Sequence, residues 1–166
     1  MITTNMLKIQ GHPVGIFTEE PPTPSFPYST AEWNGLLWMT TDLMEPFTNC
    51  EIKDVTVNGV TYNDVHFYDY TTINSLITQF QSQYPGWRLA TTAEISGLIS
   101  GHTFNEMQAV LNFIPFGDST GWGTGSYYYG YYANGEFSID VNAGTVTTYG
   151  TPGSWKDVCR LVKDIT

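Results

Sequence analysis

The most informative segment of the chain reads Pro85-Gly86-Trp87-Arg88-Leu89-Ala90-Thr91-Thr92-Ala93-Glu94-Ile95. Its first two residues end a helical pattern that begins at Thr72. In that pattern apolar residues recur on one face, at Ile73, Leu76, Ile77, Phe80 and Tyr84. Thr91 and Glu94 have the spacing of a capping box, in which each side chain accepts a hydrogen bond from the backbone of the other. The segment therefore predicts the end of one helix and the start of a second, which Gly101 would end.

The residues that follow predict a third helix and then strands. Thr103 and Glu106 repeat the capping-box spacing before another apolar stripe. Beyond Gly117, three strand patterns are separated by turns, at 127–132, 137–141 and 145–149, and they predict an antiparallel meander. The segment from Trp155 to Val162 is predicted as a closing strand. Strands at both ends and helices between them indicate an α+β domain.

The first thirty residues differ from the rest. Two short apolar runs, at 6–9 and 14–17, flank Gly11-His12-Pro13 and predict a hairpin. A proline-rich run from Pro21 to Pro27 predicts an extended connector. Because a two-stranded hairpin is marginally stable alone, we expect it to dock onto another surface. The predicted division is a docking hairpin with its connector at 1–30 and a folded domain at 31–166.

Composition excludes several classes of partner. The chain has 6 Lys and Arg against 16 Asp and Glu, a formal charge of -10, which repels nucleic acid and anionic lipid. No apolar stretch has the length of a membrane span, and the N-terminus lacks the pattern of a signal peptide. We therefore expect no nucleic-acid partner, no membrane insertion and synthesis as a soluble cytosolic product.

Three segments carry a resemblance to a known family. They are Asn34-Gly35-Leu36-Leu37-Trp38-Met39-Thr40-Thr41-Asp42-Leu43, the segment 85–95 quoted above, and Val158-Cys159-Arg160-Leu161-Val162-Lys163-Asp164. Together they resemble the Fibrobacter major paralogous domain and its formylglycine-generating-enzyme-like relatives in the C-type lectin-like superfold, found in phage and Bacteroidales display proteins. The resemblance spans about residues 32–164, with Ala90 where the family usually has proline. It implies a C-type lectin-like domain whose first and last strands pair.

The sequence offers no catalytic set. His12, His66 and His102 are scattered, and strand alternation would place Asp64, His66 and Tyr68 together on what reads most simply as a solvated face. Trp38, Trp87 and Arg88 are expected to have structural roles in and around the core.

Cofactor and metal sites are also not predicted. Formylglycine-generating enzymes use two active cysteines near the C-terminal region, where this chain has only Cys159, so that activity is not carried over. Cys50 and Cys159 are most simply free thiols, and a bond between them stays open because the paired first and last strands would bring their segments toward one end of the domain. The calcium motifs of sugar-binding lectins are missing, and Glu45-Pro46-Phe47 lacks the third oxygen ligand. We expect no catalytic residue, no cofactor and no metal.

The tyrosine-rich stretch 122–134 is the strongest candidate for a binding surface. Strand alternation would bury about half of its rings and turn the others outward. Tyrosine with Ser, Gly and Asn is typical of adaptable binding surfaces, and no Lys or Arg occurs from Leu89 to Trp155. Tyrosine ladders across strands, or a subunit contact, are the alternative interpretation. The predicted ligand-binding residues are Trp122, Tyr128, Tyr129, Tyr131, Tyr132 and Asn134.

These expectations define a function. The resemblance implies a non-enzymatic phage virion protein, a capsid decoration, head fibre or tail component, that displays a lectin-like domain. Its expected partners are other virion proteins through the N-terminal segment and a glycan or protein on the host surface, and it is a candidate homo-oligomer. The alternative is a bacterial cell-surface binding module of the same fold, and a formylglycine-generating-type enzyme ranks third.

Overall fold

The computed structural model describes residues 5–9, 12–17 and 24–166. At the N-terminus β1 (Asn5–Ile9) and β2 (His12–Phe17) pair antiparallel, which confirms the predicted hairpin. Its docking stays a prediction. The first residues of the predicted connector, Pro21, Pro22 and Thr23, lie outside the described residues. Phe26, further along it, stacks on Trp87 with ring centroids 4.6 Å apart, so the end of the connector belongs to the folded body.

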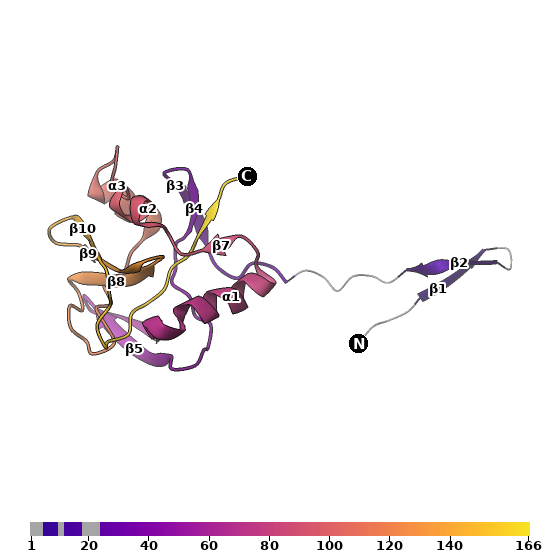
Figure 1. Cartoon of the computed structure of the whole chain (residues 1–166), viewed down its shortest axis with the longest axis horizontal. Helices are drawn as coiled ribbons and strands as arrows, with labels where there is room; N and C mark the ends of the chain where they lie inside the picture. Colours follow the sequence, from indigo (N-terminus) through magenta and orange to yellow (C-terminus); the bar gives the residue numbers. More distant parts are fainter. Residues whose placement is uncertain (1–4, 10–11, 18–23) are drawn as a thin grey trace.

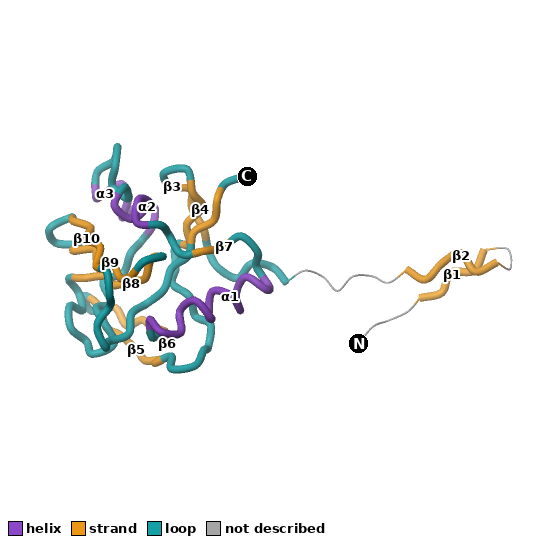
Figure 2. The backbone as a smooth tube through the Cα atoms, in the orientation of Figure 1, coloured by secondary structure: helices purple, strands orange, loops and turns teal. Residues whose placement is uncertain are grey.

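The folded body is α+β, as predicted (Figures 1 and 2). One sheet has the order β3-β4-β11-β7, built from Thr30–Trp33, Leu36–Met39, Val162–Asp164 and Trp87–Arg88. The second, β10-β9-β8, is the predicted meander of Thr145–Tyr149, Gly135–Asp140 and Tyr127–Tyr132. The third pairs β5 (Glu51–Val57) with β6 (Val60–Phe67). A 3-10 turn, η1 (Tyr70–Thr72), leads into helix α1 (Ile73–Gln83).

The segment 85–95 behaves as its residues predict. Helix α1 ends before Pro85, and the strand β7 follows directly. Helices α2 (Thr92–Ser96) and α3 (Phe104–Leu111) both begin with complete capping boxes. Arg88 satisfies a carboxylate, because both its terminal nitrogens donate to Glu94 at 2.9 Å.

Helix α2 is shorter than the sequence suggests. It ends at Ser96, and only turns continue toward Gly101. The carbonyls of Gly97 and Leu98, which a longer helix would use, accept hydrogen bonds from the side chains of Asn34 and Trp33 instead. These two side chains bind the carbonyls that follow the helix end, of which that of Gly97 also accepts a hydrogen bond from the backbone N–H of Ser100.

The predicted closing strand 155–162 is also wrong for most of its length. Only its last residue belongs to a strand, β11, which runs antiparallel between β4 and β7. Before it, residues 157–161 are buried without alternation. They form isolated bridges to Tyr68 and Gly130, and their carbonyls accept hydrogen bonds from the backbone of Met39 and Leu43. A segment packed on both sides by other elements has no solvated face and so loses the period of a surface strand.

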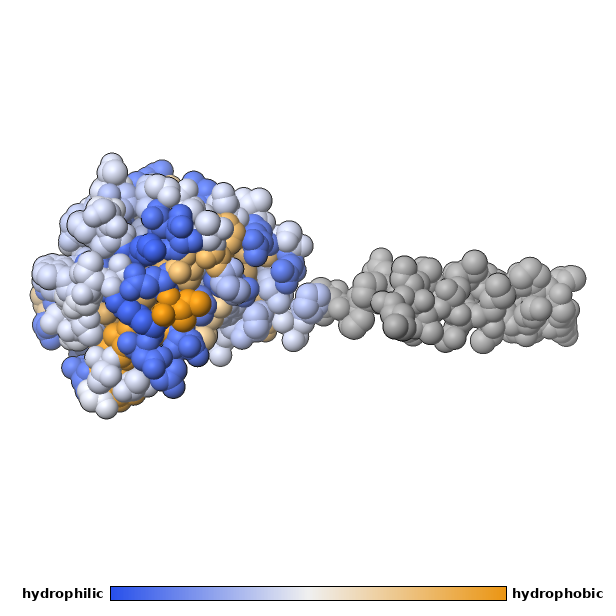
Figure 3. All heavy atoms as spheres, turned by 90° about the horizontal axis from the view of Figure 1, so that it is seen from below, coloured by the Kyte–Doolittle hydropathy of each residue, from blue (hydrophilic) through white to orange (hydrophobic). Residues whose placement is uncertain are grey.

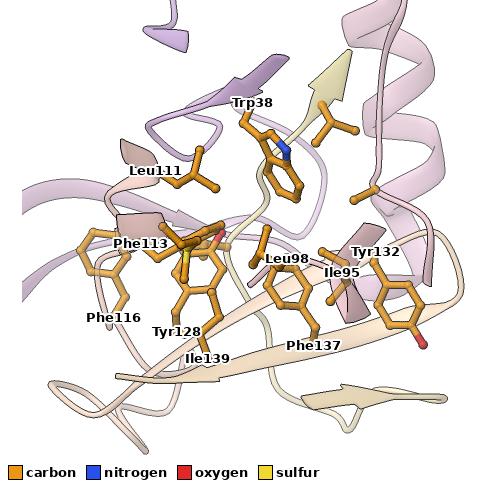
Figure 4. Close-up of a cluster of buried hydrophobic side chains, with 14 of the residues drawn as sticks. Trp38, Ile95, Leu98, Leu111, Phe113, Phe116, Tyr128, Tyr132, Phe137 and Ile139 are labelled. Atoms are coloured by element: carbon orange, nitrogen blue, oxygen red, sulfur yellow. The ribbon is translucent and has the colours of Figure 1, made fainter. Parts of the chain in front are cut away.

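Two apolar clusters form the core. In Figure 4 Trp38 from β4, Phe113 and Phe116 after α3, and Tyr128 and Phe137 of the meander converge in the first cluster. The second packs α1 against the C-terminal segment and contains Met39, Leu43, Tyr68, Ile73, Leu76, Ile77, Phe80, Trp87, Leu89, Tyr131, Cys159 and Leu161. Trp38 and Trp87 are thus core residues, as predicted.

One buried ion pair joins the C-terminal segment to the loop after β4, and its arginine also reaches the end of α3. Arg160 donates from Nε to Oδ1 of Asp42 at 3.0 Å, and its terminal nitrogens donate to the carbonyls of Leu111 and Asn112. Tyr128 donates its hydroxyl to the same Asp42 oxygen at 2.7 Å. A cation is favourable at a helix C-terminus, so Arg160 serves both the helix and the carboxylate.

The structure also bears on the predicted thiols and on the predicted solvated face of β6. Cys50 and Cys159 are both free thiols, as predicted. The expected solvated face of β6 is wrong, since His66 and Tyr68 are buried and His66 Nδ1 lies 2.7 Å from the carbonyl oxygen of Asp64. On the face drawn in Figure 3, strongly apolar side chains are confined to a small area among hydrophilic ones. Within the described residues, no helix combines the length and apolarity that crossing a membrane requires.

Candidate functional site

A groove of about 650 Å³ lies on one face of the β8-β9-β10 meander. We call it the aromatic groove, because four of its lining side chains are aromatic. It is lined by Asp118, Thr120, Trp122, Tyr129, Glu136, Tyr149, Thr151, Gly153 and Trp155. Trp122, Tyr149 and Trp155 are among the most exposed large side chains of the described body. Exposed aromatic rings gathered in one groove mark a binding site more than scattered ones do.

Strand register places the base of the groove. Glu136 of the central strand β9 lies opposite Tyr131 of β8 on one side and Tyr149 of β10 on the other. Successive side chains alternate between faces, so Tyr129 and Glu136 share the face opposite to Tyr128 and Phe137. The apolar face packs into the first core cluster, and the polar face forms the groove.

The loop 117–125 positions Trp122. Oδ1 of Asp118 accepts hydrogen bonds from the backbone of Thr120 at 2.8 Å, from its hydroxyl at 2.6 Å and from the backbone of Trp122 at 3.2 Å. The Trp122 ring stacks on Tyr127 with centroids 5.5 Å apart and also contacts Tyr129. Although 61% exposed, Trp122 is therefore held by its loop and by one ring face.

Trp155 forms another part of the groove wall. Its indole N–H donates to Oε2 of Glu136 at 3.0 Å, while 40% of its surface stays exposed. The ring lies directly against Gly153, where a Cβ atom would overlap it. A glycine at this position is thus required by the close approach of the ring.

Two carboxyl groups are buried at the base. Glu136 is 2% exposed and lines the groove, and Asp157, fully buried, lies behind it. Neither oxygen of Asp157 has a hydrogen-bond donor among the described residues, and the group within reach is the Glu136 carboxyl. Two carboxyl groups form a hydrogen bond only when one of them is protonated.

Burial is the main reason that these two carboxyl groups hold a proton. It raises the pKa of Asp157, and the charges of Glu136 and Asp118 raise it further. Burial also raises the pKa of Glu136, and the hydrogen bond from the Trp155 indole partly opposes this rise. The neighbouring charges that raise the pKa of the pair belong to carboxylates, so they add to the effect of burial.

The predicted binding residues are divided by the structure. Trp122 and Tyr129 line the groove. Asn134 lies in the β8–β9 turn, where its amide donates to the Thr92 hydroxyl at 3.1 Å, and it is not part of the groove lining. The binding role of Trp122 and Tyr129 stays a prediction.

Tyr128, Tyr131 and Tyr132 are buried in the two clusters, which corrects their assignment as ligand contacts. Tyr128 and Tyr132 face the first cluster. Tyr131 lies on the other face, but the C-terminal segment covers it, and its hydroxyl donates to the carbonyl of Tyr68 at 2.7 Å. Alternation alone could not reveal that second layer.

Sequence reasoning missed five residues of the groove and its base: Asp118, Glu136, Tyr149, Trp155 and Asp157. Glu136 occupies the polar phase of an alternating strand, which ordinarily means a solvated position. A detectable signal was Trp155, an aromatic residue shortly after the glycine- and proline-rich turn 150–153. In the described part of the chain, no three His, Cys, Asp or Glu side chains are placed to share a metal ion.

Comparisons with known proteins returned no relative. No family model matches the chain. No curated protein and no solved structure matches it either.

Proposed function

We propose that this chain is a non-enzymatic adhesion protein that binds a saccharide in the aromatic groove. The observation that carries the proposal is the groove itself, in which three exposed rings surround a base that offers hydrogen-bond acceptors. Flat rings give contact area at low cost in side-chain entropy, and carboxylate oxygens accept hydrogen bonds from hydroxyl groups. This is the combination that a hydroxyl-rich ligand with apolar C–H faces requires.

The arrangement of the carboxyl groups favours binding over catalysis. Oδ1 of Asp118 already accepts three hydrogen bonds from its own loop, which gives it a structural role. Asp157 lies behind Glu136 and is not part of the groove lining. Glycoside hydrolysis requires two carboxyl groups that flank the substrate from two sides. The base of the aromatic groove does not have this arrangement.

For the fold we propose a C-type lectin-like domain. The three segments that carry the resemblance form β4, β7 with the start of α2, and β11. Within one sheet β11 pairs with both β4 and β7, so three segments far apart in sequence become neighbours. The last strand, β11, pairs with β4, which holds Trp38 and Met39 of the first segment, and not with β3, the first strand of the body; the pairing of β4 with β11 supports the proposal.

The proposed setting is a phage virion, in which the hairpin 1–30 attaches to another virion protein and the body contacts a host-surface glycan or protein. The pairing of β1 only with β2, among the described strands, supports a separate attachment element. Mass spectrometry of purified virions should detect the chain at stoichiometric amounts. Its recovery from a bacterial cell surface instead would favour the alternative of a surface module of the same fold.

The binding proposal is tested on a glycan array with the full chain. Single changes Trp122→Ala, Tyr149→Ala and Trp155→Ala should each weaken binding by about tenfold or more, because each removes an exposed ring from the groove. Val60→Ala, which shortens an equally exposed side chain in β6, is the control and should bind as the parent does. Binding that survives all three groove changes would place the ligand elsewhere and overturn the proposal.

A further inference from the structure

Every ionisable side chain in the lining of the aromatic groove is an acid or a tyrosine. Asp118 and Glu136 line it, Asp157 lies directly behind, and no Lys, Arg or His belongs to the lining. Lys53, on the neighbouring strand β5, donates to the carbonyl of Ser119 and does not line the groove. A cleft with charges of one sign and low-dielectric walls concentrates the opposite charge.

The rings reinforce this preference. The faces of Trp and Tyr rings carry negative electrostatic potential, and four such rings line the groove. Trp122 and Trp155 come from two different loops and Tyr129 and Tyr149 from the two outer strands of the meander, so rings surround the base on several sides. Aromatic rings arranged around a carboxyl base are suited to a cation.

Asp157, which lies behind the lining, is the second carboxyl group of the acidic base, and its charge also needs compensation. A carboxyl group with no donor to either oxygen, fully buried, is an arrangement that proteins rarely leave uncompensated. In the unliganded protein the compensation is the proton it shares with Glu136. A cation that enters the groove above Glu136 would provide it instead.

We infer that the ligand group recognised in the aromatic groove carries an ammonium ion, as in an amino sugar or a choline-type headgroup. This inference rests on the proposed binding function and narrows its ligand class. The ammonium lies against the rings of Trp122 and Trp155 and above the Glu136 carboxylate. Acidic saccharides such as uronic acids are excluded, because their carboxylates would face those of the groove.

Binding of an ammonium ion has a consequence that neutral ligands do not share. A bound cation favours the charged form of Glu136 and Asp157, so binding releases the proton that the pair holds. The ionisable groups that face the pair are Asp118 on the loop, Tyr131 on β8 and the Tyr149 ring on β10, together with Lys156 beside Asp157 in the chain. Burial raises the pKa of Tyr131, which therefore stays neutral, and the carboxyl pair is the proton source.

The test compares two probes that differ in one group. Chitosan tetramer carries free amines, and its fully N-acetylated counterpart carries neutral amides on the same sugar chain. Isothermal titration with the full chain, at a pH low enough to keep the amines of the tetramer protonated, should give at least tenfold tighter binding of the amine form. Choline, whose charge does not titrate, should show the proton release as a dependence of the heat on the buffer. Choline forms a second arm, which separates a quaternary headgroup from an amino sugar.

The variant Glu136→Gln should abolish the preference for the amine form, since it keeps the acceptor for Trp155 and removes the charge. Asp140→Asn, on the same strand but outside the groove lining, removes one charge and should leave the preference intact. The proton release of the unaltered chain gives a second readout if Glu136→Gln does not fold.

Equal binding of both tetramers, or tighter binding of the acetylated one, overturns the inference while the proposed function stands. Binding of neither amine probe, chitosan tetramer or choline, also overturns it, and the glycan array then decides the proposed function separately.

Discussion

Trp155 donates its indole N–H to Oε2 of Glu136 at 3.0 Å, which joins the wall of the aromatic groove to its base. The two residues lie 19 positions apart, on β9 and in the loop before the C-terminal segment. The contact stabilises the charged form of Glu136 and holds the exposed ring at the edge of the groove. If the groove binds the proposed ligand, this hydrogen bond joins the contact surface to the protonation of the base.

Replacement of this donor should change the protonation of the base. In Trp155→Phe the ring remains but the N–H is lost, so the pKa of Glu136 should rise further above its ordinary value. Carbon-detected NMR titration of the glutamate carboxyl groups measures this directly. Trp122→Phe is the matched control, because it alters the other wall and leaves the Glu136 contact in place. An equal pKa in both variants would show that the indole bond does not govern Glu136.

Asp157 should make the protein less stable as the pH rises. Its pKa in the folded state is raised, so the native protein holds more protons than the unfolded chain above the ordinary value of 3.8. The free energy of unfolding should therefore fall as the pH increases from about that value through neutrality. Asp157→Asn supplies an amide N–H donor to Glu136 that does not titrate. The variant should therefore stabilise the protein at pH 8 by about 1–3 kcal/mol.

Urea denaturation across pH checks this prediction. Glu32→Gln, which removes one charge at an exposed position, is the control and should change stability little. If Asp157→Asn lowers the free energy of unfolding at pH 8, the buried Asp157 carboxyl group does not destabilise the native protein.

Glu94 should have the opposite effect on stability: its contribution is lost as the pH falls. The hydrogen bonds from Arg88 hold the pKa of Glu94 at about 2, below its ordinary value of 4.5. Its contribution is therefore complete above pH 4.5 and is lost as the pH falls toward 2. Because both side chains are partly solvated, Glu94→Gln should cost only about 1 kcal/mol at pH 7.

The third helix provides the control for Glu94. Glu106 occupies the same capping-box position in α3, but it has no arginine partner among the described residues. Hydrogen bonds from Thr103 also lower the pKa of Glu106, but no arginine adds to them, so Glu106→Gln should change the acid limb of the stability profile less than Glu94→Gln does. The predicted signature is a shallower loss of stability below pH 4.5 in Glu94→Gln than in Glu106→Gln, and equal profiles would contradict it.

Local signals in the sequence predicted most of the elements. Both capping boxes begin helices, the apolar stripe from Ile73 forms α1, and the glycine-containing turns separate the strands of the meander. Each of these depends on residues a few positions apart, whose physics is contained in the segment itself. Contacts between residues far apart in the sequence leave no such local pattern. Beyond the end of α2, the carbonyls of Gly97 and Leu98 accept hydrogen bonds from side chains more than sixty residues away, which no local pattern reveals.

The candidate site was predicted in part for the same reason. Alternation correctly divided the tyrosines of β8 between two faces, but which of them a ligand can reach depends on a second layer. That layer is the segment 156–161, which covers Tyr131 and leaves Tyr129 beside the groove. Glu136 has the pattern of a solvated strand position, and only the tertiary structure places Trp155 and Asp157 against it. Charged residues that approach one another only in the folded protein have no characteristic spacing in the sequence.

The loop that carries Trp122 depends on one glycine. Gly117 has φ +71°, and a Cβ atom there would lie 2.6 Å from the backbone nitrogen of Thr124 and closer still to the carbonyl oxygen of Trp122. Gly117→Ala should therefore add steric overlap to the cost of the left-handed conformation and destabilise the protein by about 3 kcal/mol.

Gly121, in the same loop, separates these two effects. Its φ is +90°, but no atom lies within 4 Å of the position that a Cβ atom would take, so Gly121→Ala should cost only about 1–2 kcal/mol. The indole N–H resonance of Trp122 reports on the loop: it should shift strongly in Gly117→Ala and little in Gly121→Ala. Equal shifts and equal stability losses would mean that the conformation alone, and not the close backbone approach at Gly117, holds Trp122 over the groove.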